Sequence, residues 1–177
     1  MQQLDLQLAG RLVTLRPFTG ADITPVYIGW LSDPELMKFS NQRFRSHSAA
    51  SCRDYLASFQ GSDNLFLAIT DDGQLVGTMT AYVSKVHQTA DIGLLIGSQS
   101  QGKGFGKDAW ETLMAYLFRS GIRKVTGGTL RCNKAMVRIM ESAGMQPDGV
   151  RKGQELVYGK PEDILYFARF NSQCSPI

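Results

Sequence analysis

Residues 97–109 read GSQSQGKGFGKDA, a stretch that holds four glycines and two lysines. The residues before it, TADIGLLIG at 89–97, are typical of a strand, and residues 107–121 carry apolar side chains at helical spacing. A glycine-rich turn that enters a helix leaves backbone N–H groups free at the positive end of the helix dipole. The stretch therefore predicts a site for a phosphate-bearing ligand, to which Lys103 and Lys107 would add positive charge.

Two common nucleotide motifs fit this loop poorly. Residues 97–103 have the G-x-x-x-x-G-K spacing of a P-loop, but Gly104 stands where the Ser or Thr ligand of magnesium should be. The dinucleotide motif G-x-G-x-x-G differs from the G-x-G-x-G of Gly102, Gly104 and Gly106, and the next strand ends without the acidic residue that binds ribose. We also expect the strand before the loop to belong to a meander rather than to a βαβ unit. A metal-dependent nucleotide hydrolase and a Rossmann domain are both disfavoured.

Hydrophobic periodicity on both sides of the loop predicts a single α+β domain. Three strand-like runs lie before the loop and should form an antiparallel meander, with Asp-Asp-Gly as the first hairpin turn. The expected order is strand 11–18, helix 23–33, helix 46–61, strands 64–70, 74–84 and 89–97, helix 107–121, strand 123–132, helix 133–144, and a strand pair at 154–159 and 164–170.

The composition is that of an ordinary globular protein, with 177 residues of which 43% are hydrophobic and 20% charged. The net charge of +3 comes from scattered basic residues, so a nucleic-acid partner is not expected. Cys52, Cys132 and Cys174 are widely spaced and form no CxxC pair, which favours reduced thiols and no metal site. Because the chain shows neither a signal-peptide pattern nor a long apolar run, we expect a cytoplasmic protein with no membrane partner. Residues 170–177 should form a loose tail.

At this point the sequence resembles the GCN5-related N-acetyltransferase (GNAT) superfamily. QGKGFG at 101–106 matches the signature Q/R-x-x-G-x-G/A, and the order of elements over residues 11–170 is similar too. LRPFTGAD at 15–22, WLSDPELMKF at 30–39, ADIGLLI at 90–96 and NKAMVRIMESAGM at 133–145 resemble its RimJ/RimL-like branch. The resemblance implies one GNAT domain over residues 1–177, with a mixed, mostly antiparallel central sheet of about six to seven strands and about four flanking helices.

The resemblance also implies acetyl-CoA as co-substrate and direct transfer of its acetyl group to a primary amine in a ternary complex. In the family, a bulge opens the strand before the loop, and backbone groups there bind the pantetheine arm. The implied cofactor-binding residues are Leu94, Leu95, Ile96, Gln101, Gly102, Lys103, Gly104, Phe105, Gly106, Lys107 and Asn133.

Catalytic groups are harder to assign. Asp91 is the candidate base, because a carboxylate within an apolar strand is unusual unless it is paired or used. The alternative for Asp91 is a solvated or structurally paired carboxylate. Many family members carry a tyrosine as general acid where this chain has Met140, so that role is unassigned unless Tyr82 takes it. The departure keeps open a non-catalytic, regulatory acyl-CoA-binding module.

Candidate acceptor-binding residues lie in three segments. Glu35 follows a proline where the family's first two helices wall the acceptor pocket, and His87 lies in a turn between strands. Arg43 and Phe44 belong to FSNQRFR at 39–45, whose aromatic and guanidinium groups suit an anionic acceptor unless this is a plain solvated loop. We therefore expect a small amine acceptor, either an amino sugar or a nucleotide-linked amino sugar. Protein N-terminal or antibiotic acetylation is the alternative, and the exposed final strands would allow a homodimer.

Overall fold

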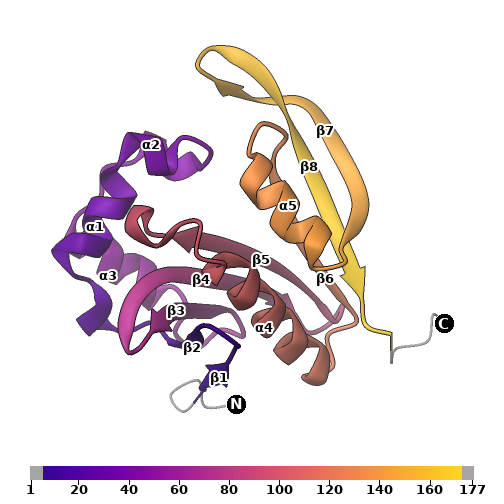
Figure 1. Ribbon diagram of the computed structural model, residues 1–177, viewed down its shortest axis with the longest axis horizontal. Helices are drawn as coiled ribbons and strands as arrows, with labels where there is room; N and C mark the ends of the chain where they lie inside the picture. Colours follow the sequence, from indigo (N-terminus) through magenta and orange to yellow (C-terminus); the bar gives the residue numbers. More distant parts are fainter. Residues whose placement is uncertain (1–5, 173–177) are drawn as a thin grey trace.

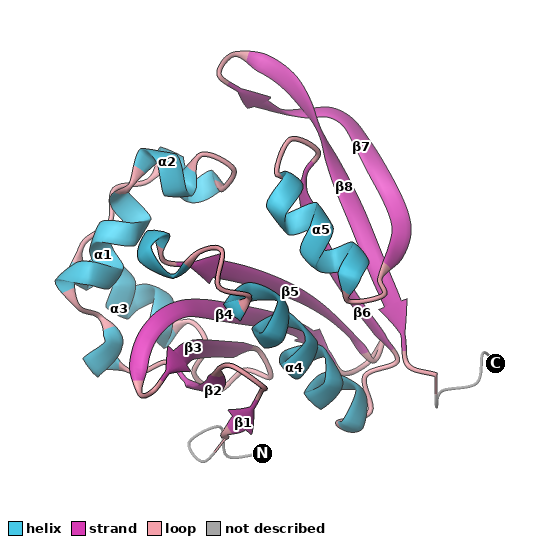
Figure 2. Cartoon of the chain, in the orientation of Figure 1, coloured by secondary structure: helices cyan, strands magenta, loops and turns pink. Residues whose placement is uncertain are grey.

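The computed structural model describes residues 6–172, in which one eight-stranded sheet is packed against five α-helices (Figure 1, Figure 2). The strands are β1 (Leu8–Ala9), β2 (Thr14–Pro17), β3 (Leu65–Asp71), β4 (Gln74–Ser84), β5 (Thr89–Ile96), β6 (Lys124–Leu130), β7 (Gln146–Val157) and β8 (Lys160–Phe170). The helices are α1 (Pro25–Ser32), α2 (Pro34–Met37), α3 (Ala49–Ala57), α4 (Phe105–Arg119) and α5 (Lys134–Ser142), with 3-10 turns η2 (Gly20–Asp22), η3 (Asn41–Phe44) and η4 (Ser98–Ser100). Cys174 and most of the expected tail lie outside the described residues.

The expected α+β architecture is confirmed, with more strands and helices than the sequence patterns suggested. The strand order is β1-β2-β3-β4-β5-β6-β8-β7, and every neighbouring pair is antiparallel except β5 and β6. The added strand is β1, which is only two residues long, and the added helix is the four-residue α2. The β7 strand begins at Gln146, eight positions before the expected start at Gln154, so the final hairpin is much longer than predicted.

One expectation was wrong. The β5 strand belongs to the antiparallel meander, but it also runs parallel to β6, and α4 connects the two. The segment β5-α4-β6 is therefore a βαβ unit, since parallel neighbours require a crossover connection and a helix commonly supplies it. This places the N-terminus of α4 at the carboxyl end of β5, where ligands of open α/β sheets bind.

Alternation along the strands divides the core between the two faces of the sheet. Leu65, Leu67 and Ile69 of β3 pack with α4, whereas Phe66 and Ala68 pack with α1 and α3. Strand side chains point to opposite faces at successive positions, so β3 is buried on both sides. The two clusters fix α4 and α5 on one face and α1 and α3 on the other.

Local capping interactions set several helix ends. The side chain of Ser48 caps α3 in a capping box with Ser51, and Asn133 caps α5 by accepting from Met136 N–H. Gly144 follows α5 with a φ of +74°, as expected for a glycine that ends a helix. The start of α4 lies at Phe105, two residues before the predicted start.

Asp108, in the first turn of α4, joins that helix to the N-terminal part of the chain. Its carboxylate accepts hydrogen bonds from the backbone N–H groups of Arg11, Leu12 and Val13 at 3.0, 2.7 and 3.0 Å. Burial alone would raise the pKa of this carboxyl, but the three backbone donors outweigh it and hold the pKa below its usual value. The turn between β1 and β2 is thereby fixed against the start of α4.

We predict that Asp108→Asn lowers the free energy of unfolding by about 2 kcal/mol, because an amide turns one acceptor position into a donor facing backbone donors. The folded-state pKa of Asp108 lies below the unfolded value of about 3.9, so its stabilisation is complete above that pH. It is lost as the pH falls through the folded pKa, and the Asn variant should lack this part of the acid sensitivity. Urea unfolding over a pH series measures both effects.

A matched control is Glu111→Gln on the same helix. Glu111 forms only partly exposed pairs with Arg11 and Lys107, at 3.5 and 3.4 Å, so its loss should cost less than about 1 kcal/mol. Equal destabilisation by the two substitutions would contradict the role given to Asp108.

Candidate functional site

The sheet opens between β5 and β6. The two strands pair at Thr89, Ala90 and Asp91 only, opposite Lys124, Val125 and Thr126. From Ile92 onward β5 keeps its pairing with β4, while β6 continues alongside β8. The β4–β5 ladder shows no register shift up to Ile96, so the opening comes from divergence of β5 and β6 and not from a bulge in β5.

The glycine-rich loop lies at the carboxyl end of β5. Gly102 and Gly104 have φ values of +75° and +84°, and Gly104 is the N-cap of α4 without any side-chain hydrogen bond to the cap. The first N–H groups of a helix have no intrahelical acceptor, and here no side chain replaces one. Backbone donors and the helix dipole therefore face the loop together, an arrangement that suits an anion.

Gly106 is needed for packing rather than for backbone conformation. A Cβ atom built on Gly106 would lie 3.1 Å from side-chain carbons of both Leu94 and Ile139. The first turn of α4 therefore fits closely between β5 and α5. Only a glycine allows this approach without displacing one of its neighbours.

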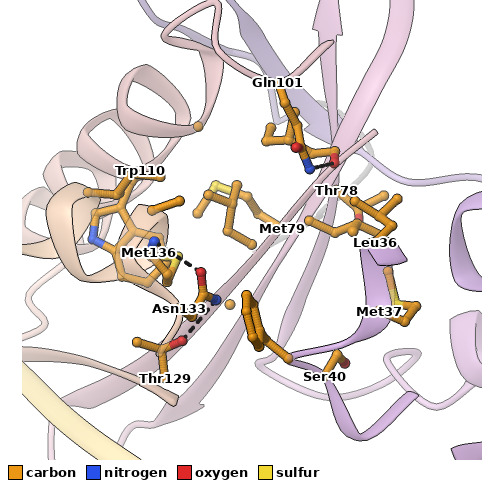
Figure 3. A pocket seen from close by; sticks show the side chains of 18 of the residues that line it. Leu36, Met37, Ser40, Thr78, Met79, Gln101, Trp110, Thr129, Asn133 and Met136 are labelled. Carbon is orange, nitrogen blue, oxygen red and sulfur yellow. Dashed lines mark hydrogen bonds between the residues drawn. The ribbon is translucent and has the colours of Figure 1, made fainter. Parts of the chain in front are cut away.

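Asn133 occupies the other side of the opening, where β6 ends and α5 begins. Its Oδ1 accepts from Met136 N–H at 3.3 Å, and its Nδ2 donates to Thr129 Oγ1 at 3.1 Å. Figure 3 shows Asn133 and Thr129 joined in this way beside the cavity. The amide is thus held in one orientation by two partners, which fixes the start of α5 relative to β6.

A cavity of about 1010 Å³ connects the loop, the strand opening and the helices of the other face. Figure 3 shows Gln101 on one side of it, Asn133 and Met136 on another, and Leu36, Met37 and Ser40 facing them. Of the residues singled out from the sequence, eleven line it: Glu35, Leu94, Leu95, Ile96, Gln101, Gly102, Gly104, Phe105, Gly106, Lys107 and Asn133. Residues that were not foreseen include Tyr27, Tyr55, Phe66, Thr80, Thr129 and Arg138.

The loop lysines differ in position. Lys107 lines the cavity and pairs with Glu111 at 3.4 Å. Lys103 is not among the lining residues, and its ammonium lies 5.9 Å from the centre of the Phe105 ring. Of the two cations, Lys107 is therefore the one placed next to a ligand in the cavity.

Asp91 lies at the last paired position before the opening, outside the cavity lining. Its Oδ1 accepts a hydrogen bond of 2.7 Å from Thr126 Oγ1, and Tyr82 is its partner across the β4–β5 ladder. Although part of Asp91 is exposed, the surrounding strands desolvate its carboxyl and raise the pKa above its usual range, and the hydrogen bond from Thr126 opposes this shift. A raised pKa makes the carboxylate a better proton acceptor near neutral pH.

The other acceptor candidates are not gathered at one place. Glu35 lines the cavity and pairs with Lys38 at 3.2 Å. The guanidinium of Arg43 is bound to Ser40 O, Leu156 O and the carboxylate of Glu155, and it stacks on Phe44 at 4.2 Å. His87 lies in the β4–β5 turn, at the opposite end of β5 from the loop, and does not line the cavity.

Comparison with known proteins agrees with this geometry. A family model described as the Acetyltransferase (GNAT) domain matches residues 12–146. The chain belongs to this family. As a GNAT protein it is an N-acetyltransferase that depends on acetyl-CoA, and the loop at 101–106, whose sequence resembles the family signature, lies within the matched residues.

Similar proteins include the uncharacterized N-acetyltransferase p20 of Bacillus licheniformis, which is 26% identical over 88% of this chain and 91% of its own. Among solved structures, the ribosomal L7/L12 alpha-N-protein acetyltransferase RimL in complex with coenzyme A has a TM-score of 0.83 at 16% identity, covering 93% and 98% of the two chains. A spermidine N-acetyltransferase from Vibrio cholerae, in complex with CoA and spermine, has a TM-score of 0.81 at 17% identity, with 91% and 96% covered. At these identities the two structures show a shared fold.

The GNAT position often held by a tyrosine is buried in this protein. Met140 is completely inaccessible and does not line the cavity. A side chain at Gly127 of β6 would contact both Met140 and Trp110, so the three positions form one tightly packed layer. The face of α5 that meets the cavity instead carries Met136 and Ile139.

Over residues 6–172 no helix has the length and apolar character that a membrane span requires. The same part of the chain contains no cluster of His, Cys, Asp and Glu side chains suited to a metal ion.

Proposed function

We propose that the protein transfers the acetyl group of acetyl-CoA directly to the primary amine of a small acceptor, with both substrates bound in the 1010 Å³ cavity. The observation that carries this proposal is the continuity of that cavity. It extends from the uncapped start of α4, past the β5–β6 opening, to a group of aromatic and acidic side chains contributed by α1, α2 and α3. Two substrates approaching from the two sides would meet at the opening.

The residues on the cofactor side fit coenzyme A. The backbone donors near Gly102 and Gly104 suit its pyrophosphate, with Lys107 as the adjacent cation. The edge of β5 from Leu94 to Ile96 has no strand partner across the opening, so its backbone groups are available to an extended amide-bearing arm. Asn133 is oriented beside that edge.

The reaction requires a neutral amine whose nitrogen attacks the thioester carbonyl carbon as the carbon–sulfur bond breaks. We assign Asp91 as the base that removes the amine proton through water. Gly93 lies on the same face of β5, roughly 7 Å along the strand towards the opening, and has no side chain to block that path. The hydroxyl of Thr80, opposite Gly93 and lining the cavity, provides a polar group on the way. The departing thiolate takes its proton from solvent.

The acceptor end of the cavity suits a cationic amine better than an anionic one. Asp33 and Glu35 contribute two carboxylates against the single ammonium of Lys38, which pairs with Glu35, while Tyr27, Tyr55 and Phe66 contribute aromatic faces. The cation expected to bind a phosphate, Arg43, is already paired with Glu155 and two carbonyl groups. Aromatic rings beside carboxylates bind protonated amines and sugar rings. We therefore favour an amino sugar without a nucleotide, or another compact amine, over a nucleotide-linked amino sugar.

The decisive experiment measures free thiol released from acetyl-CoA with a panel of amines. The panel contains glucosamine, a nucleotide-linked amino sugar, spermidine, an aminoglycoside and a peptide with a free N-terminus. We expect turnover with glucosamine or another cationic small amine and little with the nucleotide-linked sugar. Turnover with the peptide alone would favour protein N-terminal acetylation. Binding of acetyl-CoA without turnover on any amine would favour a non-catalytic acyl-CoA-binding module.

A substitution at Gly104 tests the cofactor site. Gly104→Asp should weaken acetyl-CoA binding at least about 100-fold, because it places a carboxylate and a side chain at the phosphate position. Titration calorimetry gives the dissociation constant directly.

The matched control for this variant is Gly73→Asp. Gly73 lies in the β3–β4 turn with a φ of +79°, close to the +84° of Gly104, so both variants carry similar backbone strain. Only the change at Gly104 should alter binding. A folded Gly104→Asp protein that binds acetyl-CoA as tightly as the wild type would refute the assignment.

The base assignment predicts that Asp91→Asn reduces kcat/KM by roughly 100-fold to 10,000-fold. In the wild type, kcat/KM should rise with pH through the pKa of Asp91, which lies above its usual range. The variant should lose that limb of the pH–rate profile. Asp148→Asn is the control, since Asp148 is a carboxylate bound to Lys124 at 2.8 Å on the same sheet and away from the cavity. A wild-type profile in Asp91→Asn would remove Asp91 from the mechanism.

A further inference from the structure

The η3 turn and the distant β7–β8 hairpin are held together by a group of side chains, here called the latch. Its members are Asn41, Arg43 and Glu155. One carboxylate oxygen of Glu155 accepts from Asn41 Nδ2 at 3.0 Å, and the other lies 3.6 Å from Arg43 Nη2. Arg43 also donates to Leu156 O at 3.2 Å and to Ser40 O at 2.8 Å, so its planar guanidinium bridges the two segments.

The latch is partly withdrawn from solvent, unlike most surface ion pairs. The side chains of Arg43 and Glu155 are 14% and 20% exposed. Exposed ion pairs contribute little, whereas charged groups that are withdrawn from solvent and hydrogen-bonded to neighbouring groups, as Arg43 is to two carbonyls and Glu155 is to Asn41, contribute more. Geometry and burial therefore favour a contact that fixes the position of the hairpin.

The tip of the hairpin needs such a contact. Nearly all of β7 is exposed, and the β7–β8 register is irregular between Arg151 and Glu155. In Figure 1 the hairpin extends past the end of β6, towards the side on which α2 lies. Because an isolated two-stranded hairpin is marginally stable in water, the position of the tip depends on what it touches. Within residues 6–172, the hydrogen bonds and the ion pair of the latch join the tip to η3.

The latch closes one wall of a second cavity of about 610 Å³, here called the outer cavity. Its walls are α2 with the end of α1, the segment from Gln42 to Arg45, and the tip from Leu156 to Gly159. Asp33, Glu35, Met37 and Lys38 line both this cavity and the larger one, so the two adjoin along α2. Two aromatic rings of the outer cavity are largely exposed, Phe44 at 72% and Tyr158 at 79%.

We propose that the latch is a specificity determinant of the acetyltransferase: it holds the hairpin tip in place so that the outer cavity receives the remote part of a ring-bearing acceptor. The inference rests on the proposed function of the larger cavity. Phe44 and Tyr158 offer ring faces to a sugar or other flat group, and Arg43, which stacks on Phe44, fixes the orientation of that ring. The acceptor would present its amine at the strand opening and its further rings to the outer cavity. Arg43 and Glu155 act through the hairpin and do not touch the reacting atoms.

The test compares glucosamine with kanamycin, in which further sugar rings extend from an amino sugar. Arg43→Met and Glu155→Ala should each raise KM for kanamycin about tenfold with little change in kcat, because a remote contact is lost equally in the ground and transition states. The KM for glucosamine and the dissociation constant for acetyl-CoA should stay the same. The double variant should show the effect of either single change rather than their product, since both break one latch.

The control is Lys160→Met, which also removes one positive charge from the exposed tip of the hairpin without touching the latch. Its KM for kanamycin should equal that of the wild type. Hydrogen exchange over residues 155–160 gives an independent readout of the hairpin and should accelerate in Arg43→Met but not in Lys160→Met.

The possible failures are distinguishable. An unchanged kanamycin KM in Arg43→Met, measured while hydrogen exchange shows the tip released, would overturn the specificity role of the latch alone. Acetylation of glucosamine but not kanamycin by the wild type would overturn it as well, because no ring-bearing extension would be accommodated. Retained acetyl-CoA binding without transfer to either amine would overturn the proposed function, and this inference with it.

Discussion

Backbone groups beyond Asp91 on the facing edges of β5 and β6 do not pair with each other, because the two strands separate after three paired residues. Buried peptide groups require hydrogen-bond partners, so a gap of this kind between neighbouring strands must be filled by side chains, water or ligand. Gln101 supplies one partner, its Nε2 lying 3.4 Å from Ile96 O. The remaining edge, next to the start of α4, is where an extended ligand gains most from binding.

The separation is maintained by packing on the helical face. Trp110 of α4 lies so close to Gly127 of β6 that a side chain there would meet its ring at 2.8 Å, and Met140 fills the space beside it. The first turn of α4 contacts β5 and α5 through Gly106. The large side chains of Trp110 and Met140 thus pack against β6, while the start of α4 approaches β5 closely. The carboxyl end of β5 is therefore held beside the glycine-rich loop. Met140 supports this packing, which explains in physical terms why a buried apolar side chain stands there.

The parts of the site that were predictable from sequence depend on local chemistry. Gly102 and Gly104 adopt positive φ values, and Asn133 caps a helix. Each role depends on the type of residue at that position and on its near neighbours in the sequence. The contacts that were not foreseen join distant segments. The latch pairs Arg43 with Glu155, and the carboxylate of Asp108 accepts hydrogen bonds from the backbone of residues 11–13. A single sequence holds no signal for either pairing, so Arg43 was interpreted as a ligand-binding cation.

The long final hairpin escaped prediction for a different physical reason. Strand patterns are recognised by alternation of buried and exposed residues, but β7 is exposed at nearly every position. It also contains Pro147, Gly149 and Gly153, residues that usually mark loops. An edge strand paired on one side alone does not need an apolar face, so its sequence resembles a loop although its backbone follows a ladder.

Side chains at successive positions of β5 point to opposite faces of the sheet and form two separate sets. Ile92, Leu94 and Ile96 point to the face of α4 and α5, where they pack against the core and position the strand edge. Asp91, Gly93 and Leu95 point to the opposite face, beside Tyr82, Thr80 and Thr78 of β4. A shift of one residue in the β4–β5 register would exchange these sets and bury the Asp91 carboxylate against α4. The regular ladder from Gly77 to Ser84 therefore preserves the division between a strand edge fixed by apolar packing and a face that carries the carboxylate of Asp91, the base that we propose.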